Sequence, residues 1–69
     1  MQISARNQLS GTVQEVTPGA VNTTVKVALA VGDVMTSSIT KEAAEELGLA
    51  PGKAVTVIVK ASDVMLGVS

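Results

Sequence analysis

Apolar side chains, many of them valine, recur at every second position in several short segments of this 69-residue chain. A period of two places alternate side chains on opposite faces of an extended backbone, so it predicts β-strands rather than helices. The segments with this pattern are residues 8–13, 22–30, 34–39 and 54–60. We expect the first strand to begin near Ile3, and we expect residues 64–68 to form a fifth strand that closes the sheet.

The 54–60 segment is apolar at consecutive positions, with Ile58 between Val57 and Val59. Apolar residues on both faces are typical of a strand that is covered on both sides, so we expect this strand to be central in its sheet. Turns are expected where Pro, Gly or Asp favour chain reversal, at residues 17–19, 31–33 and 51–52. The strands are therefore short and connected by tight turns.

The period changes at Thr40, whose hydroxyl suits the N-cap position of a helix. Residues 41–47 combine strong helix formers with apolar residues on one face, and they predict a helix of about two turns. Gly48 is suited to the left-handed position that ends a helix, and Pro51 prevents the helix from resuming. A helix this short needs packing against the strands for stability.

Five short strands, with one short helix between the third and the fourth, predict a mainly β fold. The arrangement matches a five-stranded Greek-key barrel of the oligonucleotide/oligosaccharide-binding (OB) type. An open meander with the helix packed on one face is the alternative. No repeat, linker or low-complexity segment divides residues 1–69, so we expect a single domain.

The composition indicates that the chain does not act alone. Chains below about 70–80 residues seldom bury enough apolar surface to be stable as monomers. This chain is 46% hydrophobic but has no Phe, Tyr or Trp, and only 16% of its residues are charged. Because it has no Cys and no His, we expect neither disulfides nor a side chain that binds a metal cation directly. Association with further copies through an exposed apolar patch is the expected source of stability.

Charge and residue types argue against several functions. Five basic and six acidic residues, with no aromatic side chain, disfavour nucleic-acid binding even though many barrels of this type bind oligonucleotides. The absence of His and Cys and the scatter of the acidic residues argue against an enzyme, and we expect no cofactor. No run reaches the roughly 18 apolar residues of a membrane span, and the amino terminus lacks a secretion signal. We therefore expect a cytoplasmic protein with no membrane partner.

Three polar segments stand out from the strand surfaces: residues 4–7, 38–40 and 60–62. Arg6 is the only arginine, and its planar fork of donors suits the binding of an anion with several oxygens. The helix start at Thr40 offers a hydroxyl and backbone N–H groups at the positive end of a helix dipole. Lys60 adds a second cation, so the three segments together fit a dianion. Taken separately, these residues also have ordinary structural roles as surface charge, N-cap and edge-strand lysine.

The same segments resemble the motifs of a known family. These motifs are Ser4-Ala5-Arg6-Asn7-Gln8-Leu9, Thr36-Ser37-Ser38-Ile39-Thr40, Glu45-Glu46-Leu47-Gly48-Leu49 and Lys60-Ala61-Ser62-Asp63-Val64-Met65. Together they resemble the molbindin (Mop) family of small molybdate-binding proteins over essentially the whole chain. The resemblance implies an OB-type barrel that assembles as a homo-oligomer, a hexamer built as a trimer of dimers. It also implies that molybdate or tungstate is held at subunit interfaces and stored in the cytoplasm for molybdenum homeostasis.

The resemblance assigns the oxyanion-binding residues by position. They are Ser4, Ala5, Arg6, Asn7, Thr40, Ala43, Lys60, Ala61 and Ser62. Side-chain donors are expected from Ser4, Arg6 and Lys60. Some relatives have a hydroxyl residue where this chain has Ala43, so Ala43 is expected to offer only its backbone N–H. The alternative function is a structural oligomerisation module without an oxyanion ligand.

Overall fold

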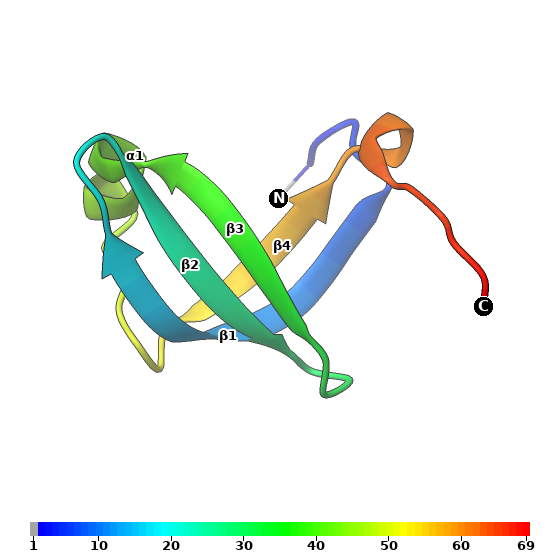
Figure 1. The fold of residues 1–69 in the computed structure, drawn as a ribbon, viewed down its shortest axis with the longest axis horizontal. Helices are drawn as coiled ribbons and strands as arrows, with labels where there is room; N and C mark the ends of the chain where they lie inside the picture. Colours follow the sequence, from blue (N-terminus) through cyan, green and yellow to red (C-terminus); the bar gives the residue numbers. More distant parts are fainter. Residues whose placement is uncertain (1) are drawn as a thin grey trace.

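The computed structural model describes residues 2–69, which form one curled antiparallel sheet, one short α-helix and one 3-10 turn (Figure 1). The elements in chain order are β1 (Asn7–Pro18), β2 (Asn22–Leu29), β3 (Val34–Thr40), α1 (Lys41–Glu46), β4 (Ala54–Val59) and the 3-10 turn η1 (Ala61–Asp63). The strand order is β3-β2-β1-β4, so β3 and β4 form the two edges of the sheet. Within residues 2–69, no helix is long and apolar enough to cross a membrane.

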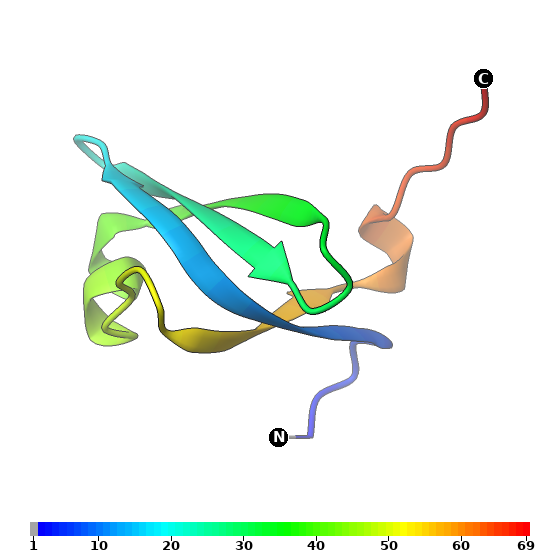
Figure 2. The ribbon, with the colours of Figure 1, turned by 90° about the horizontal axis from the view of Figure 1, so that it is seen from below.

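The long strand β1 connects the two sides of the sheet because it changes partner along its length. Residues 7–12 pair with β4 and residues 11–18 pair with β2, with an irregularity between Val13 and Glu15. A bulge of this kind bends a strand and increases its twist. The sheet therefore curls, and β3 and β4 become the two borders of an open side (Figures 1 and 2).

Gly11 lies where β1 has a partner on both sides, opposite Leu29 of β2 and Val55 of β4. A Cβ atom at this position would lie 2.6 Å from Val27 Cγ1 and 3.0 Å from the carbonyl oxygen of Ala28. Glycine is therefore required here by the close approach of β2.

The core is formed by aliphatic side chains that alternate along β1 and β2. Val13 and Val25 are each 2% exposed and Val27 is 4% exposed. Six half-buried side chains pack against them: Val16, Leu29, Ile39, Leu49, Val55 and Val57. The alternation predicted from the sequence is confirmed for β2, because every second residue from Thr23 to Val27 is buried. In β1 only part of the predicted face is buried, since Val13 is 2% exposed but Leu9 is 39% exposed.

The helix begins and ends as the sequence predicts. Thr40 is the N-cap, and its Oγ1 accepts a hydrogen bond of 3.1 Å from the backbone N–H of Ala43. At the other end, Gly48 has a φ of 64° and its N–H donates to the carbonyl oxygen of Glu45, while the N–H of Leu49 donates to that of Ala44. This pair of bonds is the Schellman motif, which satisfies the last carbonyl groups of a helix. Ala44 is the buried residue of α1.

The predicted five-stranded barrel is wrong in its strand count, because the sheet has four strands. Residues 64–68 form no strand and extend away from the sheet (Figure 1). Their apolar alternation indicates which side chains share a face, but it does not specify a partner strand. The alternative of an open meander also fails, because β4 crosses back to pair with β1 rather than with β3.

Two further strand predictions are wrong. The first strand begins at Asn7 rather than near Ile3, because β4 ends at Val59, opposite Asn7, and leaves earlier residues without a partner. The fourth strand is an edge strand and not a central one. Ile58, which suggested a second buried face, is 43% exposed in this chain. The apolar Ile58 on the outer face of β4 therefore did not indicate that this strand is central in the sheet of a single chain.

Candidate functional site

The first group of predicted site residues lies at the end of the β1–β4 pair. Asn7 is opposite Val59, and the side-chain amide of Asn7 donates a 3.1 Å hydrogen bond to the carbonyl oxygen of Val59. Arg6 directly precedes β1 and Lys60 directly follows β4, so each is the next residue beyond this pair. Opposite residues of an antiparallel pair have Cα atoms roughly 4.5–5.5 Å apart, so the pairing brings residues 4–7 and 60–62 to the same end of the sheet.

This first group is exposed and rich in donors. Ser4, Arg6, Lys60, Ala61 and Ser62 are all exposed, whereas Ala5 and Asn7 are half-buried. The backbone there is held locally, because Gln8 Nε2 donates to the carbonyl oxygen of Ala5 at 3.3 Å. Two cationic side chains beside two hydroxyl groups form a surface suited to an anion with several oxygens.

The second group lies at the start of α1. Thr40 is the last residue of β3, opposite Asn22 of β2, and the backbone N–H of Lys41 donates to the carbonyl oxygen of Val21 at 2.9 Å. Thr40 is exposed and Ala43 is half-buried. Because the Thr40 hydroxyl oxygen accepts its bond from Ala43, the hydroxyl proton of Thr40 remains a donor for a ligand.

The backbone N–H of Ala43 already has a hydrogen-bond partner within the chain. Its backbone N–H was expected to be offered to a ligand, but in this structure the N–H donates to Thr40 Oγ1. An N-cap hydroxyl commonly takes the N–H of the third helical residue, which is the position of Ala43. A ligand can use this N–H only by displacing the Thr40 hydroxyl, so Thr40 is the better candidate donor of the two.

The two groups lie at opposite ends of the molecule. Residues 4–7 lie at the start of β1, whereas Thr40 lies across β2 from the far end of β1, near Pro18. The 12 residues of β1 separate the two ends, and the molecule measures 34 Å along its longest axis. Figure 1 shows α1 at one end and η1 at the other. A hydrogen bond spans only about 3 Å, so one chain cannot bring both groups to one ligand.

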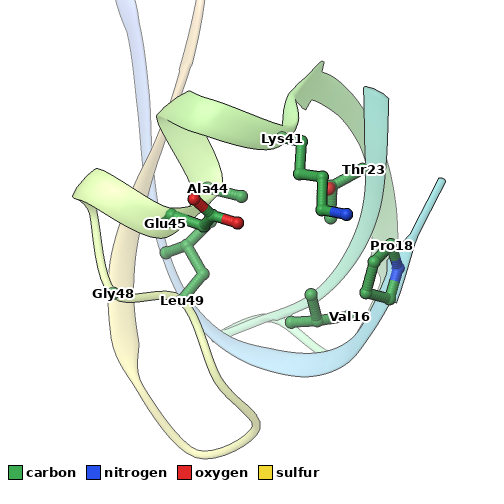
Figure 3. A pocket seen from close by; sticks show the side chains of 8 residues that line it. All are labelled: Val16, Pro18, Thr23, Lys41, Ala44, Glu45, Gly48 and Leu49. Atoms are coloured by element: carbon green, nitrogen blue, oxygen red, sulfur yellow. The ribbon is translucent and has the colours of Figure 1, made fainter. Parts of the chain in front are cut away.

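A small cavity beside α1 was missed from the sequence (Figure 3). It has a volume of about 220 Å³ and is lined by Val16, Pro18, Thr23, Lys41, Ala44, Glu45, Gly48 and Leu49. Thr23 is only 2% exposed, although it is polar. Thr23 lies two residues before the buried Val25, so the alternation of β2 could have predicted that Thr23 is on the inner face. Among residues 2–69, no group of three or more His, Cys, Asp or Glu side chains is placed to hold a metal ion.

Comparison with known domains agrees with both the motifs and the fold. The family model described as the TOBE domain matches residues 3–66, which include both groups of predicted site residues. The chain belongs to the TOBE domain family. The predicted membership of the molbindin branch is confirmed by the relatives that this TOBE domain resembles.

Molybdenum-pterin-binding protein MopA of Rhodobacter capsulatus is 52% identical over 66 residues, which are 96% of this TOBE domain and 25% of MopA. A probable molybdenum-pterin-binding protein of Haemophilus influenzae is 44% identical over 68 residues, 99% of each chain. The structure of ModG, described as a cytoplasmic molybdate-binding protein with molybdate bound, superimposes with a TM-score of 0.95 at 51% identity. That match covers 100% of this TOBE domain and 49% of the ModG chain. These relatives carry the names of binding proteins and not of enzymes.

Proposed function

We propose that this TOBE domain binds molybdate, or tungstate in its place, and stores the oxyanion without chemical change. The ligand is supported by its relatives, among them ModG with molybdate bound. The residue types support the same class of ligand, because Arg6, Lys60 and the neighbouring hydroxyl donors match a dianion. The proposal includes a cytoplasmic role in molybdenum homeostasis, as a binding protein rather than an enzyme.

The separation of the two donor groups is the observation on which the proposed arrangement depends. A ligand that uses both groups must lie between two copies, with Arg6 and Lys60 of one copy facing Thr40 of the next. Such a contact joins different surfaces of the two copies, and it can form reciprocally across a twofold axis or head to tail around a closed ring. We propose a homo-oligomer on this basis, and the molbindin resemblance makes a hexamer, a trimer of dimers, the proposed assembly.

Exposed apolar side chains support the association. Val31, Met65, Leu66 and Val68 are 83%, 93%, 95% and 102% exposed in the single chain. Such a large apolar exposure in a soluble domain usually marks an interaction surface. The pairing also leaves an opening between β3 and β4 for one more strand, so the proposed assembled fold is the OB-type barrel.

Size is the proposed basis of selectivity. Sulfate and molybdate are both tetrahedral dianions, so the charges of Arg6 and Lys60 attract either ion. Molybdate is the larger ion, and a cavity formed between two copies fixes the distance between the donors. We propose the free oxyanion rather than a pterin complex as the ligand, because the chain has no aromatic side chain on which a pterin ring would stack.

Isothermal titration with molybdate, tungstate and sulfate tests the proposal. We expect saturable heat with the first two ions and weak or no heat with sulfate. Arg6→Ala removes a charge-assisted donor worth about 1.5–3 kcal/mol, so the dissociation constant should rise roughly 10- to 100-fold. Lys26→Ala is the matched control, because Lys26 is an exposed cation in the middle of β2, opposite Thr36. No heat with either molybdate or tungstate would refute the proposal.

Thermal unfolding with and without molybdate distinguishes the proposed function from the alternative, a structural oligomerisation module. A ligand that binds only the folded state stabilises it by about 2.7 kcal/mol at a concentration of 100 times its dissociation constant. The proposed function therefore predicts a molybdate-dependent rise in Tm at fixed protein concentration. The structural module predicts an assembly whose Tm does not respond to molybdate.

A further inference from the structure

The two cations at the β1–β4 end of the sheet lie directly beyond the last strand pair. That pair is Asn7 with Val59, so Lys60 follows the end of the ladder. Figures 1 and 2 both show the start of β1 beside η1, the turn that Lys60 precedes. Lysine has a flexible stem of four carbons, so the position of its backbone determines which volume its ammonium group can reach. The affinity of this end for an anion therefore depends on what holds the backbone of Lys60.

The side chain of Asn7 holds the peptide unit before Lys60. Its Nδ2 donates a 3.1 Å, partly buried hydrogen bond to the carbonyl oxygen of Val59, which is 52 positions away in the chain. Because a peptide unit is planar, a bond that holds the carbonyl of Val59 also fixes the direction of the N–H of Lys60. On the other side, the carbonyl oxygen of Lys60 accepts a 2.9 Å bond from the N–H of Asp63 in η1. Both peptide units that flank Lys60 are therefore held within the single chain.

Gln8 makes a similar contact on the Arg6 side of the site. Its Nε2 donates to the carbonyl oxygen of Ala5, which belongs to the peptide unit before Arg6. This bond is longer, at 3.3 Å, it is exposed, and it joins residues only three positions apart. Water replaces an exposed hydrogen bond at little cost, whereas the partly buried bond of Asn7 joins the ends of two strands. Of the two amides, Asn7 therefore contributes more to the geometry of the site.

We propose that Asn7 is a positioning residue for the oxyanion and that it acts through Lys60. Its hydrogen bond to Val59 keeps the backbone of Lys60 where the ammonium group reaches the same anion as Arg6. A backbone that is ordered before binding loses less conformational freedom when the ligand arrives, and this raises the affinity. The motif places Asn7 among the residues around the ligand, and its bond to Val59 gives it a role that needs no contact with the ligand. This inference rests on the proposed function.

A double-mutant cycle tests whether Asn7 acts through Lys60. Asn7→Leu keeps the shape of the side chain but removes the donor, and it should raise the dissociation constant for molybdate about 3- to 10-fold, as expected for the loss of one neutral hydrogen bond. In a Lys60→Ala background no ammonium group remains to be positioned, so Asn7→Leu should change that constant by less than about twofold. A residue that contacts the ligand directly, or one that only stabilises the fold, would weaken binding by the same factor in both backgrounds. That result would overturn the inference.

Gln8→Met is the matched control, because it removes the amide of the adjacent residue, whose bond holds the peptide unit before Arg6 and not the one before Lys60. Its effect on the dissociation constant should be smaller, and it should be the same with and without Lys60→Ala. If Gln8→Met couples to Lys60 as strongly as Asn7→Leu does, the coupling is not specific and the inference is wrong. Light scattering checks that each variant keeps the wild-type mass. If Asn7→Leu does not, Asn7→Ser takes its place in the cycle, because serine is small and polar and lacks the amide donor.

NMR relaxation of the backbone amide of Lys60 separates this inference from the proposed function. In the protein without ligand, Asn7→Leu should lower the order parameter at Lys60 from the rigid value of about 0.85, whereas Gln8→Met should leave it unchanged. An unchanged order parameter in Asn7→Leu would overturn the inference. If the wild type and Asn7→Leu bind molybdate equally well, the positioning role is wrong and the proposed function stands. If the wild type binds neither molybdate nor tungstate but Asn7→Leu lowers the order at Lys60, the function is wrong and the amide still holds the peptide unit.

Discussion

Replacing Gly11 with alanine should destabilise the fold, although glycine to alanine changes in strands often stabilise proteins. The new methyl group would lie 2.6 Å from Val27 Cγ1, closer than carbon atoms in van der Waals contact. It would also lie 3.0 Å from the carbonyl oxygen of Ala28, which is backbone and moves little. Val27 is 4% exposed and packs in the core with Val13, so its side chain has little room to turn away.

The expected size of the effect follows from two opposing contributions. Overpacking a core costs about 1–3 kcal/mol, and this total includes about 0.5–1.5 kcal/mol for forcing Val27 from its preferred rotamer. Replacing glycine restricts the unfolded chain and offsets about 0.4–1 kcal/mol. The net loss in the free energy of unfolding should be about 1–2 kcal/mol. For a chain of this size, that loss lowers Tm by roughly 5–15 °C.

Thermal unfolding followed by circular dichroism measures the effect at one fixed protein concentration, because association shifts Tm by mass action. Gly67→Ala is the matched control, since a Cβ at Gly67 has no atom within 4 Å in the single chain. We expect Gly67→Ala to stay within a few degrees of the wild type. A Gly11→Ala variant as stable as the wild type would show that β1 and β2 do not approach as closely as the structure indicates.

Three further changes test the core, the cap and the anion site. Val25→Ala should lower the free energy of unfolding by about 2 kcal/mol in urea denaturation, whereas Val21→Ala, at a 73% exposed position, should change it by less than about 0.5 kcal/mol. Equal losses would contradict the assignment of the core. Thr40→Ala should lower the free energy of unfolding by about 1 kcal/mol because it removes the N-cap hydroxyl, whereas Thr40→Ser keeps a hydroxyl and should lose much less. Equal Tm values for the two variants would show that the N-cap does not contribute to stability. Arg6→Lys should raise the dissociation constant for molybdate about tenfold, measured by titration calorimetry, because lysine keeps the charge but lacks the planar fork of donors. An unchanged dissociation constant would show that only the charge at this position contributes to binding.

Elements that depend on neighbouring residues were predicted well from the sequence. The N-cap at Thr40 and the helix end at Gly48 follow from side-chain and backbone preferences within a few residues. The alternation of Val25 and Val27 likewise identified the buried face of β2. The molbindin motifs identified the family, and the TOBE match over residues 3–66 agrees with them.

Strand partners were predicted less well. The alternation in residues 54–60 predicted a central strand and that in residues 64–68 a closing strand. In the structure β4 is an edge strand, and residues 64–68 have no strand partner within residues 2–69. An apolar face is equally well buried against the same chain or against another copy, so the pattern does not distinguish the two cases. The same limit applies to the site. The motifs identify Arg6 and Thr40 as site residues, but they do not indicate that β1 holds the two residues at opposite ends of the molecule.

The sequence by itself determined the local structure of this chain and the chemical class of its ligand, because periodicity, capping and donor types are properties of residues close together in the chain. Only the tertiary structure decided that Arg6 and Lys60 share one end of the sheet and Thr40 the other. That result depends on which strands pair and where β1 bends, between Val13 and Glu15. Pairing is set by the packing of residues distant in sequence around Gly11 and Val27, and no local pattern encodes it.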